Sequence, residues 1–377
     1  MKVAILGNRA FGYVRPMAEG LKRMFADIAV TAEIFYDGHG QLAKVQPALR
    51  QYLGKATQGS AVKNILKYFL REAPSFYPFL KQMRQFDVII VVNSIVPAFL
   101  KEFFRDEAVR YWLPQTPIVL YDVFYLPTRG PWGKWLREGN PSKGVAQPGN
   151  WGLERYDWYL VGSVVSECPL PTGRQPYSLV GLNFVHDSLC VEPKKEFTAL
   201  IDFEIPEHMV ERAIQVLACQ ETDTKYTVLH GRYSMEDIRS LYRQSSIFFI
   251  AHRESFGLPI CELQACGSYL FTPYSNWCPA HWLKADLAQP GPGTLSKNFV
   301  VYNNDKQFLI NEIERVKSSY DPYEVLDTFQ NTYPQLYWGD LEELKQFVRM
   351  VESGEIHSQC HREYASITCD YTGPFPV

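Results

Sequence analysis

Short apolar runs alternate along the chain with longer segments in which apolar residues recur every three or four positions. Runs such as "KVAILG" at 2–7 and "DVIIVVNS" at 87–94 are apolar almost throughout, which is typical of strands buried on both faces. The segment "PAFLKEFFRDEAVRYWL" at 97–113 has the helical period instead. Strands that alternate with helices in this way indicate a parallel sheet covered by helices on both faces.

The same alternation begins again near residue 197 with "FTALIDFE", and it continues through the predicted helix "SMEDIRSLYRQ", where Ser234 is the expected N-cap. We therefore expect an α/β chain with two Rossmann-like domains, at 1–165 and 176–340, separated by a linker. A C-terminal helix and tail at 341–377 are expected to pack back on the first domain. Neither half contains Gly-x-Gly-x-x-Gly after a strand, which disfavours an NAD-dependent dehydrogenase.

Length, charge and cysteine usage narrow the class of protein. A chain of 377 residues is too long for one ordinary core, which supports two domains. A net charge of −3 gives no basic field for nucleic acid. The eight cysteines include no Cys-x-x-Cys pair, so we expect reduced thiols and no metal cluster. No apolar run is long enough to span a membrane and a strand begins at once, so a cytoplasmic location is expected.

Residues 126–152 interrupt the alternation with a stretch rich in Gly, Pro and Trp. Long irregular segments in compact domains are often lids or binding loops, but a disordered excursion has the same composition. Both interpretations stay open, and a binding loop here would serve an acceptor.

The stretch "HRESFGLPICELQACGSYLF" at 252–271 carries the candidate chemistry. Pro259 suits the first turn of a helix and Gly267 suits its end. Glu254 then lies in the loop ahead of the helix, and Glu262 lies within or just past the first turn. A helix N-terminus favours anions such as a diphosphate, whereas a carboxylate accepts hydrogen bonds from sugar hydroxyls. On spacing alone, a loop charge and a helix-dipole complement explain the two glutamates as well.

The segment from "TVLHGRYSMEDI" through "ESFGLPICELQACG" to "YLFTP" resembles the C-terminal-domain signature of GT-B-fold glycosyltransferases. The likeness is to the retaining group with a Glu-x(7)-Glu motif, and it covers about 48 residues. It implies two Rossmann-like β/α/β domains that face each other across a cleft. It also implies C-terminal helices that cross back to the first domain, and a donor held mainly by the second.

The resemblance implies a role for each matched residue. Glu254 would contact hydroxyls of the transferred sugar, and Glu262 would hold the ribose hydroxyls. Further donor-binding residues are implied along the motif and in the loop around the base: Arg253, Ser255, Phe256, Gly257, Leu258, His230, Gly231, Arg232 and Tyr233. In the first domain, the turn "GNRAFG" ending at Gly12 would face the donor, and Asn93 closes a strand, although an ordinary turn explains the glycines too.

The sequence departs from the family at two places. The family has a glycine and a basic pair after the first strand of the second domain, but "ALIDFEIPEHMVER" has no Lys or Arg before Arg212. Arg253 and Arg232 are the candidates to neutralise the diphosphate. Asp122 closes the strand "PIVLYDV" where the family tends to have a histidine, and it would be either a turn cap or the base of an inverting enzyme. We favour retention.

The predicted function is therefore transfer of a sugar from a nucleotide-diphosphate sugar to a carbohydrate, lipid-linked or other hydroxyl acceptor. The resemblance implies no metal and no cofactor, with the nucleotide sugar as co-substrate. Two alternatives remain: a catalytically weak nucleotide-sugar-binding protein, which the missing basic pair favours, and a nucleotide-sugar epimerase of the same fold.

Overall fold

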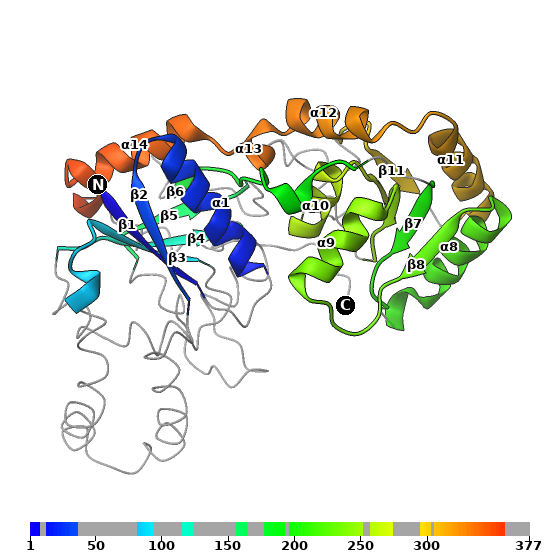
Figure 1. The fold of residues 1–377 in the computed structure, drawn as a ribbon, viewed down its shortest axis with the longest axis horizontal. Coiled ribbons are helices and arrows are strands. Elements are labelled where there is room, and N and C mark those ends of the chain that lie inside the picture. Colours follow the sequence, from blue (N-terminus) through cyan, green and yellow to red (C-terminus); the bar gives the residue numbers. More distant parts are fainter. Residues whose placement is uncertain are drawn as a thin grey trace, which may run out of the picture. The chain divides into compact units, whose positions relative to one another are not determined.

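The computed structural model describes residues 1–7, 13–36, 81–92, 115–123, 156–163, 177–192, 196–204, 206–251, 257–273, 295–302 and 305–358. These residues form two compact units (Figure 1). Unit 1 contains the described residues up to Ser163, those from Tyr177 to Val180, and those from Asp340 onward. Unit 2 contains those from Gly181 to Gly339.

A six-stranded parallel sheet forms the centre of unit 1, with the order β2-β1-β3-β4-β5-β6. The apolar runs become its strands because every residue of β3, β4 and β5 is buried. The strands are β1 (Lys2–Gly7), β2 (Thr31–Tyr36), β3 (Val88–Val92), β4 (Ile118–Asp122), β5 (Trp158–Val161) and β6 (Tyr177–Leu179).

Two helices of unit 1 pack together and on its sheet. Helix α1 (Val14–Asp27) turns one apolar face to β1, β2 and β3, with Leu21, Met24 and Phe25 fully buried. Helix α14 (Leu341–Glu352), orange to red in Figure 1, contacts α1 and β6. It is followed by the 3₁₀ helix η8 (Glu355–Ser358). The chain therefore returns to the first sheet after completing unit 2, as the fold prediction proposed.

Unit 2 has a five-stranded parallel sheet with the order β11-β10-β9-β7-β8. Its strands are β7 (Thr198–Ile201), β8 (Lys225–Val228), β9 (Ile247–Phe249), β10 (Tyr269–Pro273) and β11 (Phe299–Tyr302). Strand β8 lies on one side of β7. Strands β9, β10 and β11 follow one another on the other side. The order therefore reverses between β7 and β9, which is where open α/β sheets bind their ligands.

The helices of unit 2 begin and end where local sequence signals place them. Ser234 caps α9, with its Oγ accepting the Asp237 amide at 3.1 Å, as predicted. Pro259 lies in the first turn of α10, also as predicted. The helices are α8 (Met209–Glu221), α9 (Met235–Gln244), α10 (Leu258–Ala265), α11 (Lys306–Ser318), α12 (Pro322–Thr332) and α13 (Pro334–Tyr337), with the short 3₁₀ helices η5 (Asp187–Leu189) and η6 (Pro206–His208).

The observed fold is the predicted one, with two parallel α/β sheets, but some short elements had no sequence prediction. β6 has only three residues and lies past residue 176, so the first sheet continues to Leu179 before the chain enters unit 2. The predicted helix at 97–113 and the segment 126–152 lie outside the described residues. None of the helices in the described ranges is long and apolar enough to cross a membrane.

Gly267 closes α10 in a backbone conformation that favours glycine, with φ +82°. A Cβ added there would lie 2.6 Å from the Pro322 Cβ and 2.7 Å from the Pro322 carbonyl oxygen. Gly231 has a similar φ of +68°, but an added Cβ would meet nothing within 4 Å. Substitution of Gly231 by alanine would therefore measure the cost of the backbone conformation alone. Substitution of Gly267 would add the cost of a steric clash.

We predict that Gly267→Ala lowers the free energy of unfolding by about 2–4 kcal/mol, because strain and overpacking add. Gly231→Ala carries the backbone strain alone and should cost about 1 kcal/mol. Urea denaturation followed by fluorescence measures both. Equal losses for the two variants would contradict the close packing of α10 against the start of α12.

Candidate functional site

The ends of β7 and β9 are tied together at the point where the strand order of unit 2 reverses. Asp202 follows β7, and its Oδ2 accepts the amide of Ala251, which follows β9, at 3.1 Å. Its Oδ1 accepts the Phe203 amide at 2.8 Å. The side chain thus satisfies two backbone amides at the carboxyl edge of the sheet. Ala251 and Gly257, the N-cap of α10, are the described residues on either side of the motif residues 252–256 in the chain.

A small pocket lies at the same edge, between the ends of β7 and β9 and the start of α8. Its lining residues come from these three elements and the turns beside them: Ile201, Asp202, Phe203, His208, Glu211, Arg212, Gln215, Phe249, Ile250 and Ala251. The Arg212 guanidinium reaches back from α8 to donate to the Asp202 carbonyl oxygen. A cation therefore stands at the end of β7, where the sequence itself has no Lys or Arg.

Helix α10 begins at this side of the sheet without a side-chain cap. Its N-cap is Gly257, with extended backbone, and its first intrahelical bond joins the Cys261 amide to the Gly257 carbonyl. The amides of Leu258 and Ile260 precede that bond and have no helical acceptor. α10 is buried from Ile260 to Ala265, whereas Pro259 at its start is exposed. Binding of an anion at this end stays a prediction.

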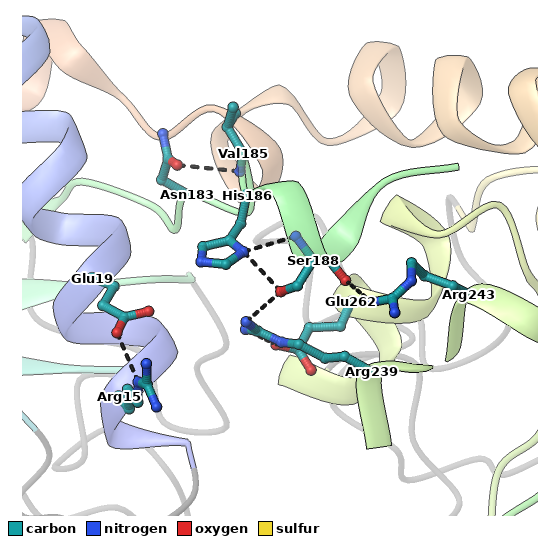
Figure 2. Close-up of polar contacts among 9 residues, drawn as sticks. All are labelled: Arg15, Glu19, Asn183, Val185, His186, Ser188, Arg239, Arg243 and Glu262. Carbon is teal, nitrogen blue, oxygen red and sulfur yellow. Dashed lines mark hydrogen bonds and ion pairs between the residues drawn. The ribbon is translucent and has the colours of Figure 1, made fainter. Parts of the chain in front are cut away.

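Glu262 lies in the second turn of α10 and is only 5 % exposed. Arg239, on α9, is equally buried and is its partner (Figure 2). The guanidinium donates twice to one carboxylate oxygen, from Nη2 at 2.6 Å and from Nε at 3.1 Å, and both bonds end on Oε1. No other residue in the described part of the chain donates a hydrogen bond to Glu262, so Oε2 retains its capacity to accept.

Burial raises the pKa of the Glu262 carboxyl above its ordinary value, and the charge and hydrogen bonds of Arg239 oppose that rise. A carboxylate removed from water is costly unless a cation compensates it. The ionised state of Glu262 therefore depends on Arg239.

Arg239 also holds a segment near the start of unit 2. Its Nη1 donates to the Ser188 Oγ at 2.9 Å, and this hydroxyl lies 2.7 Å from the His186 Nδ1 (Figure 2). The Ser188 amide donates to the same Nδ1 at 3.0 Å, so Nδ1 is an acceptor and the hydroxyl proton points to it. One turn along α9, Arg243 donates to the Ser188 carbonyl at 2.9 Å.

The loop after β8, predicted to surround the base, is exposed over His230, Gly231 and Arg232. The Tyr233 hydroxyl accepts the His230 amide at 3.3 Å, which closes the turn. Neither Arg232 nor any other member of this loop contacts Glu262 among the hydrogen bonds of the described residues. The loop is open to a ligand but holds no preformed polar contact with the motif helix.

In unit 1, Asp122 ends β4 and is 1 % exposed. Its Oδ1 accepts the Val123 amide, from the next residue along the chain, at 2.7 Å. Arg15 follows the predicted glycine turn closely in sequence. It forms a salt bridge of 2.7 Å with Glu19 on the same helix, α1 (Figure 2). The other predicted site residues lie outside the described residues: Gly12, Asn93, Arg253, Glu254, Ser255 and Phe256.

The sequence prediction missed Arg239, Ser188, His186 and Arg212. A signal for Arg239 was present, because it falls with Met235, Ile238 and Tyr242 on the buried stripe of α9. A charged residue on an apolar stripe indicates a buried partner. Ser188 and His186 carry no comparable pattern in the sequence.

No family model and no curated protein matches the chain. Among solved structures, it is similar to a Listeria monocytogenes protein assigned provisionally as a UDP-N-acetylglucosamine 2-epimerase, with 12 % identity over 94 % of this chain and 96 % of that one, and a TM-score of 0.45. It is also similar to the catalytic domain of starch synthase IV from Arabidopsis thaliana bound to ADP and acarbose, with 12 % identity over 95 % and 99 % of the two chains, and a TM-score of 0.48. A third is MurG of Acinetobacter baumannii, with 9 % identity over 93 % and 99 %, and a TM-score of 0.41. At these values the likenesses say nothing about the reaction.

We predict that Arg239→Met and Glu262→Leu each lower the free energy of unfolding by about 3–5 kcal/mol, because each leaves a buried charge without its partner. The double variant should lose far less than the sum, since two apolar side chains replace the whole pair. A double-mutant cycle in urea measures the coupling.

The matched control is Glu312→Ala, which breaks the pair between Glu312 and Arg315 on α11, where the Arg315 side chain is 56 % exposed. It should change stability by less than about 1 kcal/mol. Additive losses for Arg239 and Glu262 would contradict the buried pair.

Proposed function

We propose that the chain is a glycosyltransferase that moves a sugar from a nucleotide-diphosphate sugar to an acceptor hydroxyl. The bond from the sugar C1 to the diphosphate oxygen breaks, and a bond from C1 to the acceptor oxygen forms. The hydroxyl proton leaves with the diphosphate if configuration is retained. The observation that carries the proposal is that Glu262 lies in a buried ion pair on α10, whose uncapped N-terminus follows β9 at the reversal of strand order in unit 2.

The proposed site combines the two kinds of group that a nucleotide sugar requires. The end of α10 presents backbone amides and a partial positive charge for the diphosphate. Glu262 pairs with Arg239 through Oε1 alone and so offers Oε2 to a hydroxyl donor, which supports its assignment to the ribose. Glu254 is proposed to contact the transferred sugar on the strength of the motif alone.

We further propose that the leaving diphosphate is neutralised without a metal, by the helix end and a basic side chain. Arg212 joins Arg232 and Arg253 as a candidate, because its guanidinium lines the pocket between the ends of β7 and β9. Its guanidinium also pairs with the Glu204 carboxylate at 3.7 Å, so Glu204 compensates part of its charge.

The proposed stereochemical course is retention. An inverting enzyme needs a base that reaches the acceptor hydroxyl. Asp122 is buried and its Oδ1 already accepts the Val123 amide, which disfavours it as that base.

The test is incubation with a panel of ADP-, GDP-, UDP-, CDP- and dTDP-sugars, with and without a mixture of hydroxyl acceptors. We expect one donor class to release nucleoside diphosphate, since slow transfer to water cleaves the same bond. Glu254→Gln should lower the rate at least about 100-fold, in the range seen when a single transition-state contact is removed. Glu324→Gln, on the exposed side of α12, is the control and should leave the rate unchanged.

Three outcomes would contradict the proposal or part of it. A donor recovered with altered sugar configuration would favour an epimerase. Measurable nucleotide-sugar binding with no cleavage of any donor would favour a binding protein. Product of inverted configuration would refute retention alone.

The role of the cations is tested by Arg212→Gln and Arg232→Gln. If Arg212 stabilises the leaving group, its loss should lower kcat about 10²-fold with a smaller change in KM, because the charge develops in the transition state. Arg315→Gln serves as the surface control. A change in KM alone would show that Arg212 contributes only to ground-state binding.

A further inference from the structure

The geometry of the Arg239–Glu262 pair is unusual for two fully buried ions. An arginine and a carboxylate that meet for stability alone tend to form two parallel bonds, one to each oxygen. Here Nε and Nη2 both donate to Oε1, and Oε2 is left without a donor among the described residues. The pair therefore compensates the charge of Glu262 while half of the carboxylate stays available.

The third donor group of Arg239 fixes this one-oxygen arrangement. Nη1 donates to the Ser188 Oγ, which in turn faces the His186 Nδ1. Because the guanidinium is planar and rigid, a bond from Nη1 to Ser188 sets the direction in which Nε and Nη2 point. If Ser188 were absent, the guanidinium could rotate toward a two-oxygen pair that would occupy Oε2.

We propose that Arg239, oriented by Ser188 and His186, is a positioning residue that compensates the charge of Glu262 through Oε1 and holds its Oε2 ready for a ribose hydroxyl of the nucleotide. This inference rests on the proposed function, which it deepens. It assigns the ability to distinguish ribose from 2′-deoxyribose to Arg239, Ser188 and His186, a relay of three residues outside the Glu-x(7)-Glu motif. The relay links Glu262 on α10, through Arg239 on α9, to Ser188 in η5 and to His186, the N-cap of η5.

The proposal distinguishes Arg239 from its neighbour Arg243. Both lie on α9 and both hold the Ser188 segment, but Arg243 donates to the Ser188 carbonyl and pairs with Glu192, and it does not contact Glu262. Loss of either arginine loosens the same segment. Only loss of Arg239 removes the compensation and orientation of Glu262, so Arg243→Met is a matched structural control.

The experiment is calorimetric titration of the full chain with ADP, GDP, UDP and CDP and with their 2′-deoxy counterparts. We expect the preferred ribonucleotide to bind about 10- to 100-fold more tightly than its deoxy form, the range for a hydrogen bond to a charged group. Arg239→Met should reduce this ratio to within about 3-fold of unity. Arg243→Met should lower thermal stability and leave most of the ratio in place, because Arg239 keeps both of its hydrogen bonds to Glu262.

Two milder variants keep the test decisive if Arg239→Met folds poorly. Arg239→Lys retains the charge but cannot reach Glu262 and Ser188 together, so it should restore part of the ratio. Ser188→Ala removes only the orienting acceptor and should lower the ratio between about 2- and 10-fold.

An unchanged ratio in folded Arg239→Met, Arg239→Lys and Ser188→Ala would overturn the inference and leave the proposed function intact. The same holds if Arg243→Met lowers the ratio as much as Arg239→Met, because the effect would then be general loosening of α9. If the unaltered chain binds no nucleoside diphosphate, the proposed function fails and the inference fails with it.

Discussion

The buried pair of Arg239 and Glu262 is the interaction on which the candidate site depends. Each ion is removed from water, so neither α9 nor α10 can move away from the other without leaving a charge uncompensated. The same guanidinium reaches Ser188, which ties the segment near the start of unit 2 to both helices. The placement of α10 is therefore set by a charge pair as well as by apolar packing.

The topology of unit 2 explains why polar groups collect near this pair. Connections diverge where the strand order reverses, so the ends of β7 and β9 are not covered by a shared crossover. Backbone amides at that edge need acceptors, and Asp202 supplies them. Arg212 satisfies the adjoining carbonyl, and the result is a polar edge built before any ligand is present.

Most of the fold and part of the site could be predicted from the sequence, because strong local signals determine them. Long apolar runs gave the strands, Ser234 gave a cap, and Pro259 and Gly267 gave the bounds of α10. Three-residue β6 has too few positions for a period to emerge. Arg239 lies 23 residues from Glu262, so their contact depends on how α9 and α10 pack, and no local pattern specifies that packing.

Asp202 and Glu262 differ in whether their carboxylate oxygens are already used by hydrogen bonds within the protein. Both carboxylate oxygens of Asp202 accept hydrogen bonds from backbone amides, which reduces its capacity to bind a ligand. Its role is to join two strand ends. Glu262 is more deeply buried, yet its compensation comes through one oxygen alone. Its Oε2 has no hydrogen-bond donor among the described residues, so a hydroxyl group could donate to it. That difference, which the spacing of Glu254 and Glu262 could not reveal, is the physical reason for assigning Glu262 to a hydroxyl group and for leaving Asp202 to the fold.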